Sequence, residues 1–132
     1  MKSIQPAGWV KPKGYSNGVV AEGRTVFIAG QVGWEPTSPT PKFPSTFAEQ
    51  WDLALSNVMA VLREAGGAPE HLVRMTCYVT DKREYLDSLD AVGVSWKKHV
   101  GRIFPAMALV QVVALVEDRA KVEIEATAVI PA

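Results

Sequence analysis

Several residue types and patterns are scarce in this sequence. It contains a single cysteine, Cys77, and only two histidines, and its longest apolar run, residues 106–116, is interrupted by Gln111. One cysteine excludes an internal disulfide and a zinc site built from several cysteines. The run is too short to span a bilayer, which takes roughly 20 apolar residues. The sequence therefore predicts no membrane insertion and a buried, unreactive Cys77 thiol.

Targeting signals and net charge are lacking as well. Residues 1–6 do not contain the apolar stretch of a secretory signal peptide, and a lone cysteine suits a reducing compartment, so we expect a cytoplasmic protein. The 14 Lys and Arg residues balance 14 Asp and Glu residues. A net charge of zero removes the attraction that supplies most non-specific affinity for nucleic acids. Neither a nucleic acid nor a membrane is therefore an expected partner.

What the sequence does contain is typical of a folded domain. Its 132 residues are 48% hydrophobic, whereas disordered chains combine low hydrophobicity with high net charge. The length fits one domain over residues 1–132, which buries roughly two thirds of the surface of its unfolded chain. A core of that size needs no disulfide or structural metal to hold it.

The first half of the chain predicts two loops, a hairpin and a helix. Proline and glycine gather in residues 6–18 and 33–44, where they disfavour helix and strand. Short β-type runs at 19–22 and 25–29, joined by a glycine-containing turn, predict a hairpin. Apolar side chains at helical spacing then predict a helix that Thr46 begins, in a capping box with Glu49, and that Gly66-Gly67 ends.

The second half predicts a strand, a helix and two more strands. Residues 71–80 are rich in β-branched and aromatic side chains, and Asp81 caps a helix that extends to Gly101. Two strands follow, a long buried one at 107–115 and an alternating one at 121–130. The order β-β-α-β-α-β-β predicts an α+β fold, a mixed sheet with two helices on one face. The other face needs cover, and oligomerisation would supply it.

The clearest candidates for chemistry lie on the last strand and in two glycine-containing segments. Glu123 and Glu125 share one face of the strand, where they either form an acid and base pair or are solvated. If a partner subunit covered Glu123, burial would raise its pKa and make it a proton shuttle. The amides of residues 30–33 either bind an anion or form a turn. Tyr15, in a glycine-flanked loop, is either packed or a substrate ligand.

The sequence contains no residue pattern that indicates a metal site or a nucleophilic triad. The histidines His71 and His99 stand alone, without carboxylates or cysteines at metal-ligand spacing. The only basic cluster, residues 96–102, lies at a predicted helix C-terminus, where cations offset the helix dipole. Anion or nucleic-acid binding is the alternative interpretation of that cluster.

Six segments, in order along most of the chain, resemble the RidA (YjgF/YER057c/UK114) family of enamine/imine deaminases. They are Gly14-Tyr15-Ser16-Asn17-Gly18, Val26-Phe27-Ile28-Ala29-Gly30-Gln31, residues 55–67 with Leu62-Arg63-Glu64-Ala65-Gly66-Gly67, residues 73–81, Phe104-Pro105-Ala106 and Lys121-Val122-Glu123-Ile124-Glu125-Ala126. The resemblance implies a chorismate-mutase-like fold, assembled as a homotrimer with clefts between subunits. It also implies hydrolysis of reactive enamines and imines to a ketoacid and ammonia, without a metal or cofactor.

The resemblance assigns roles to individual residues. Glu123 matches a glutamate that positions water and moves protons, Tyr15 a tyrosine that lines the pocket, and Gly30 a glycine of the pocket. Ala29 occupies a position where the family frequently has a hydroxyl residue. We therefore expect Glu123 to be catalytic and the other three residues to bind substrate.

Two further substrate-binding positions depart from the family pattern. Met107 stands where an arginine clamps the substrate carboxylate, and Leu109 where a thiol is often found. A methionine cannot replace the bidentate contact of arginine with a carboxylate. Arg102 or Lys121 is a conceivable substitute, but their expected positions in a loop and a strand do not support that role.

Three functions are compatible with these residues. The first is a deaminase for a less anionic or differently anchored imine, such as a ring-cleavage product of the aminomuconate type. The second is a small-molecule-binding relative that kept the fold and the cleft without catalysis. The third, a ribonuclease, is disfavoured by the zero net charge.

Overall fold

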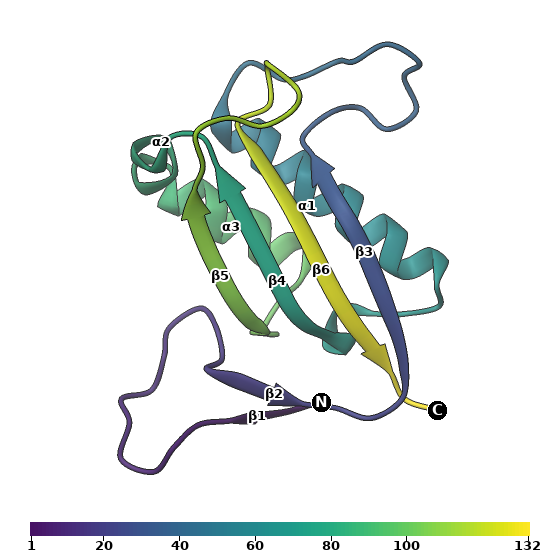
Figure 1. The fold of residues 1–132 in the computed structure, drawn as a ribbon, viewed down its shortest axis with the longest axis vertical. Coiled ribbons are helices and arrows are strands. Elements are labelled where there is room, and N and C mark those ends of the chain that lie inside the picture. Colours follow the sequence, from purple (N-terminus) through teal and green to yellow (C-terminus); the bar gives the residue numbers. More distant parts are fainter.

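The computed structural model describes residues 1–132 and arranges four strands in one sheet with the helices on a single face (Figure 1). The strand order is β3-β6-β4-β5, in which β6 is antiparallel to both neighbours and β4 is parallel to β5. The elements in chain order are β1 (Lys2–Ile4), β2 (Gly18–Val20), β3 (Arg24–Val32), α1 (Phe47–Glu64), η1 (Pro69–His71), β4 (Leu72–Val79), α2 (Lys82–Asp87), α3 (Leu89–His99), β5 (Ala106–Gln111) and β6 (Val122–Ile130). The predicted α+β fold with a mixed sheet is confirmed.

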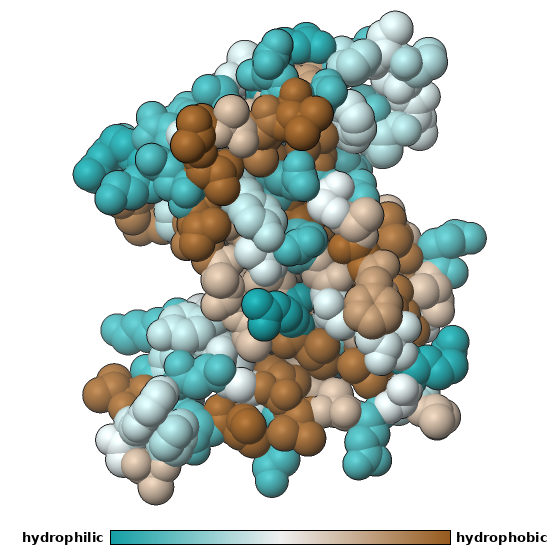
Figure 2. Space-filling model, in the orientation of Figure 1, coloured by the Kyte–Doolittle hydropathy of each residue, from teal (hydrophilic) through white to brown (hydrophobic).

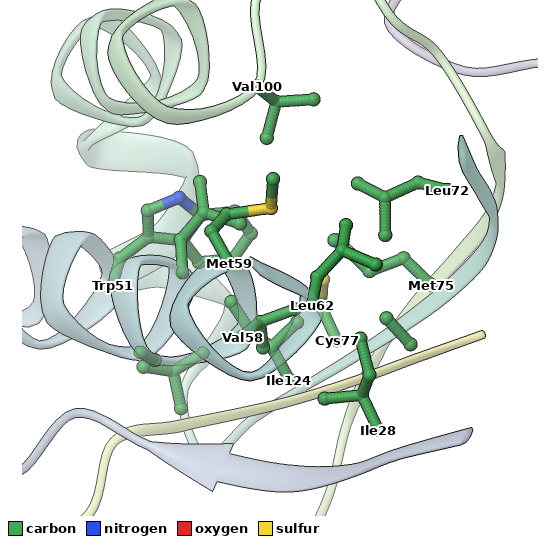
Figure 3. Close-up of a cluster of buried hydrophobic side chains, with 14 of the residues drawn as sticks. Ile28, Trp51, Val58, Met59, Leu62, Leu72, Met75, Cys77, Val100 and Ile124 are labelled. Atoms are coloured by element: carbon green, nitrogen blue, oxygen red, sulfur yellow. The ribbon is translucent and has the colours of Figure 1, made fainter. Parts of the chain in front are cut away.

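The hydrophobic core lies between α1 and the covered face of the sheet (Figure 3). Trp51, Val58 and Leu62 of α1 are buried against Met75 of β4 and Ile124 of β6. Each buried side chain of this size contributes about 1.5–3 kcal/mol relative to its exposed state. In Figure 1 the helices lie behind the sheet and leave its front face uncovered.

The predicted ends of α1 are confirmed. The Thr46 hydroxyl accepts a hydrogen bond from the Glu49 amide at 3.2 Å and donates one to the Glu49 carboxylate at 2.7 Å. At the other end Gly66 has a φ of +84°, which favours glycine, and the Gly67 amide donates to the Leu62 carbonyl at 3.0 Å. Local capping chemistry therefore fixes both ends of the helix.

The predicted hairpin of residues 19–22 and 25–29 is wrong. The short strand β2 pairs instead with β1, which the sequence analysis did not predict, whereas β3 pairs with β6 from Arg24 opposite Ile130. Gly23 has a φ of +145°, and a Cβ there would lie 2.1 Å from the Ile130 carbonyl oxygen. This glycine thus packs against the end of β6 and starts β3 in the main sheet, rather than folding it back on β2.

Two other predicted elements have different bounds. The second helix is divided at Ser88 into α2 and α3, because the Ser88 amide bonds to the Tyr85 carbonyl in a tighter turn. The strand predicted at 107–115 ends at Gln111, and it is not buried as predicted, because every residue of β5 is at least partly exposed; Val113 beyond it is fully exposed. Its only neighbour, β4, ends at Val79, so no ladder is available to the later residues.

A buried glutamine holds two loops to the start of β6. Gln50 of α1 is 1% exposed, and its side-chain amide donates to the carbonyls of Pro44 and Arg119, at 3.0 Å each. Its carbonyl oxygen accepts from the Lys121 amide at 2.8 Å. One side chain therefore satisfies three backbone groups that belong to no helix or strand.

We expect Gln50→Leu to lower the free energy of unfolding by at least about 3 kcal/mol, because each of the three backbone groups left without a partner costs about 1–3 kcal/mol. Urea unfolding followed by circular dichroism measures the change. The control is Glu64→Leu on the exposed surface of the same helix, which should change stability by less than about 0.5 kcal/mol. Equal effects of the two substitutions would contradict this role of Gln50.

The single thiol belongs to the core. Cys77 of β4 is fully buried under the helices, and this burial raises the pKa of the thiol to about 12. Because the thiolate is the reactive form, the neutral thiol is inert over the physiological range. The predicted buried and unreactive thiol is confirmed.

Native protein near neutral pH should therefore not react with a chromogenic disulfide reagent, whereas protein in concentrated guanidinium chloride should release one equivalent of thiolate. The free thiol is read by absorbance before and after unfolding. Full labelling of the native protein within minutes would contradict a core position for Cys77.

Candidate functional site

An apolar pocket of about 730 Å³ lies on the helix-covered side, beside the edge strand β5. Its wall is formed by aromatic and aliphatic side chains from all three helices and from β5, among them Trp51, Tyr85, Val92, Trp96 and Leu109. The indole N–H of Trp51 is buried and has no hydrogen-bond partner. The pocket is therefore suited to an apolar or aromatic ligand.

The N-terminal loop brings Tyr15 to this pocket. The neighbouring Ser16 bridges to Ala106 at the start of β5, and its amide donates to the Pro105 carbonyl at 3.0 Å. The Ser16 hydroxyl also donates to the Phe104 carbonyl. These bonds fasten the loop along the sheet edge, so that Tyr15, which is 42% exposed, lines the pocket.

Met107 and Leu109 reach the same pocket through the register of β5. In the parallel pairing, Met107 is opposite Met75 and Leu109 is opposite Cys77, and both of those β4 residues are buried under the helices. Met107 and Leu109 accordingly pack against the core and line the pocket. Three of the predicted substrate-binding residues, Tyr15, Met107 and Leu109, thus line the same pocket.

Glu123 lies on the opposite face of the sheet. Its neighbours Val122 and Ile124 are buried under the helices, so the alternation of β6 turns Glu123 toward the uncovered face. There its carboxylate lies against Gly30, where a Cβ would be 2.2 Å from the Glu123 Oε2 atom. The register of β3 shifts between Ile28 and Gln31, at the residues that flank this contact. A glycine at position 30 is therefore what makes room for the carboxylate.

The second carboxylate of β6 is already engaged. The Tyr78 hydroxyl donates to Glu125 at 2.7 Å, and this hydrogen bond raises the pKa of Tyr78 above its ordinary value of 10. Glu123, by contrast, makes no hydrogen bond or ion pair within the chain. Ala29 lines a smaller hollow of about 410 Å³ on this face, beside Glu125. Sequence reasoning missed Tyr78, because only the register between β4 and β6 reveals its neighbours.

The predicted site residues consequently form two groups on opposite faces of one sheet. Tyr15, Met107 and Leu109 belong to the pocket, whereas Gly30 and Glu123 belong to the uncovered face. Within a single chain the carboxylate does not reach the pocket. Each group by itself contains only part of the set of site residues that the sequence motifs predict.

The charged residues around the pocket are all cations. Lys13, Lys97 and Arg102 line it, and no Asp or Glu does. Lys121, one of the two conceivable substitutes for the missing arginine, instead forms an ion pair with Glu84 at 3.0 Å. Arg102 does line the pocket, contrary to the expectation that its loop position gives no support for such a role. A negatively charged group of a ligand would meet only positive side chains here.

The sequence analysis expected His99 to stand alone, but the structure places it in a cluster of polar side chains. Its Nε2 atom lies 3.0 Å from Asp52 of α1, which also accepts from the Ser95 hydroxyl at 2.8 Å and pairs with Lys98 at 3.4 Å. Partial burial alone would raise the pKa of Asp52, but these bonds and charges hold it below its usual value of 3.8. The cluster joins α1 to α3 outside the pocket.

No group of three or more His, Cys, Asp or Glu side chains is arranged to hold a metal ion. None of the helices combines the length and the apolar character that crossing a membrane requires.

Known proteins resemble this chain over most of its length. Residues 10–130 match the family described as Endoribonuclease L-PSP. The 2-iminobutanoate/2-iminopropanoate deaminase of Capra hircus is 35% identical over 115 residues, which cover 87% of this chain and 79% of that protein. A RutC family protein of Synechocystis sp. is 32% identical and covers 99% of this chain and 98% of its own length.

Solved structures agree with these sequence matches. A protein of the conserved Rid family from Yersinia pestis, YyfB, has a TM-score of 0.82 at 30% identity, with 98% of both chains covered. The motifs, the fold and the relatives therefore point to one family. This chain belongs to the Endoribonuclease L-PSP family, which is the RidA (YjgF/YER057c/UK114) family that its six segments resemble, and has the chorismate-mutase-like fold of that family.

Proposed function

We propose that this protein hydrolyses a reactive enamine or imine to a carbonyl compound and ammonia, in clefts between the subunits of a homotrimer. The observation that carries the proposal is the unpartnered carboxylate of Glu123, set against Gly30 on an uncovered sheet face. The names of the relatives support the reaction, since one of them is a 2-iminobutanoate/2-iminopropanoate deaminase.

The two separate halves of the site support an assembly of several subunits. Hydrophobic side chains surround a hydrophilic centre on the uncovered face (Figure 2), and they include Phe27, which is 80% exposed, and Val110, which is 44% exposed. Exposed apolar surface of this kind favours a subunit contact. A neighbouring copy that covers this face would bring its own pocket, with Tyr15 and Met107, to the Glu123 carboxylate.

In such a cleft Glu123 would transfer protons at both stages of hydrolysis. Water attacks the imine carbon, the C=N electron pair moves to nitrogen, and the Glu123 carboxylate takes a proton from the water. The protonated carboxyl then gives this proton to the nitrogen. In the second stage the Glu123 carboxylate takes the remaining hydroxyl proton and gives it to the nitrogen, so that the C–N bond breaks as the carbonyl forms and ammonia leaves.

A non-catalytic binding protein is the second candidate. The observation in its favour is Met107, because a pocket without an arginine at this position has lost a strong carboxylate contact. Ribonuclease activity, which the family description names, is disfavoured: Glu123 and Glu125 on the uncovered face would repel phosphates.

We expect Glu123→Gln to lower kcat/KM at least about 100-fold, because general acid–base groups contribute 10²–10⁴-fold. Imines are generated in situ from amino acids by an amino-acid oxidase, and ammonia release is followed against a buffer blank. The control is Glu125→Gln, which retains an acceptor for Tyr78 and should keep activity within about threefold. Full activity of Glu123→Gln would refute the mechanism, and wild-type rates equal to buffer would favour the binding protein.

Mixing two inactive variants tests whether the site lies between subunits. Leu109→Trp overfills the pocket half, and Glu123→Gln removes the carboxylate half. In mixed trimers about a quarter of the clefts combine two intact halves, so co-expression should restore activity. The control pairs Glu123→Gln with the double variant Glu123→Gln/Leu109→Trp, which leaves no intact carboxylate. If the first mixture is no more active than its components, the inter-subunit cleft is wrong.

A further inference from the structure

We propose that the substrate is a 2-imino acid with a large aromatic side chain, which fills the pocket, and that Arg102 binds its carboxylate at the pocket mouth. This inference rests on the proposed function. It names the substrate class and a specificity-determining residue that lies five positions before Met107, at a different place from the arginine of the family pattern.

The position of the reacting carbon follows from the two halves of the site. Glu123 lies on the sheet face opposite the pocket of its own chain, so in the proposed assembly the carboxylate of a neighbouring copy would approach the pocket from its open side, here called the mouth. The imine carbon must therefore lie at the mouth. Its carboxylate, one bond away, lies there too, and only the side chain of the imino acid extends inward.

The interior of the pocket fits an aromatic side chain. Its volume of about 730 Å³ lies in the range of roughly 300–1,000 Å³ that holds drug-sized ligands. The rings of Trp51 and Tyr85 are 5.8 Å apart between centroids and tilted by 46°, and both line the pocket with Trp96. Offset and tilted aromatic contacts are the arrangements that a bound ring prefers.

A glycine in the middle of α3 widens the pocket further. Gly93 lines it, and a Cβ at this position would have no atom within 4 Å. Glycine inside a helix costs about 1 kcal/mol relative to alanine, and neither a positive φ nor a close contact requires it here. The open space beside Gly93 is therefore the feature that this residue provides.

Arg102, which follows the end of α3, lines the pocket and is exposed to solvent, as a residue at the mouth would be. The amides of Val100 and Gly101 both donate to the Trp96 carbonyl, and Gly101 adopts a φ of +86° that turns the chain out of the helix. Arg102 then lines the pocket and makes no hydrogen bond or ion pair within the chain. Its planar guanidinium can bind a carboxylate through two parallel hydrogen bonds, which neither Lys13 nor Lys97 can do.

Imines made from phenylalanine and from alanine by an amino-acid oxidase separate large from small substrates. We expect kcat/KM for the phenylalanine-derived imine to be at least about tenfold higher, the size of effect that apolar burial in a pocket gives. Gly93→Phe, which fills the space, should reduce that ratio at least about tenfold. The matched control is Val94→Phe on the exposed side of the same helix, outside the pocket, which should leave both rates within about twofold.

Arg102→Gln tests the anchor. It should raise KM for the phenylalanine-derived imine about tenfold with a smaller change in kcat, because the contact is made equally in ground and transition states. Arg63→Gln, at the exposed end of α1, is the control. Met107→Arg should shift preference toward the alanine-derived imine, since it fills the pocket and adds a second carboxylate contact.

A binding measurement separates failure of this inference from failure of the proposed function. Trp51 and Trp96 line the pocket, so quenching of tryptophan fluorescence reports binding of 3-phenylpropanoate and of propanoate. We expect tighter binding of 3-phenylpropanoate, weakened by Arg102→Gln and Gly93→Phe. If this pattern appears but no imine is hydrolysed, the pocket assignment stands and deamination is wrong. If imines are hydrolysed without preference for the aromatic one, or 3-phenylpropanoate binds no better than propanoate, the substrate class is wrong.

Discussion

The alternation of side chains along β6 is the constraint on which the rest of the structure depends. This strand pairs with β3 on one side and β4 on the other, so its two faces become the two faces of the sheet. Val122 and Ile124 enter the core under α1, which commits Glu123 to the uncovered face. A shift of one residue in register would bury the carboxylate and expose the core side chains. Fold and candidate chemistry are thus fixed by the same pairing.

How much of the fold the sequence predicts depends on whether the signal is local. The ends of α1 are readable because Thr46, Glu49 and Gly66 act on the helix turn beside them. Local signals of this kind do not predict which strand pairs with β2 or where β5 ends. Both depend on strands that are distant in the chain, β1 in one case and the last residue of β4 in the other. Propensity does not encode where a neighbouring strand ends.

The same difference between local and long-range signals decides how much of the candidate site the sequence predicts. The motifs identify Tyr15, Gly30 and Glu123, and alternation predicts that Glu123 and Glu125 share a face. No sequence spacing predicts that Tyr78 donates to Glu125, which leaves Glu123 as the unpartnered carboxylate. Nor does it predict that the turn at Gly101 brings Arg102 to a pocket wall. These contacts arise from sheet register and from the packing of α3, which only the folded chain defines.

Separation of the two halves also explains how substrate preference can change without loss of chemistry. Met107 and Leu109 lie on the helix-covered face, and Glu123 and Gly30 lie on the other. The residue at position 107 therefore shapes the pocket without touching the contact between Glu123 and Gly30. With Met107 apolar, positive charge remains only on Lys13, Lys97 and Arg102. The pocket is apolar at Met107 and Leu109 and positive at Arg102, so recognition of an apolar side chain and recognition of a carboxylate would fall to different residues.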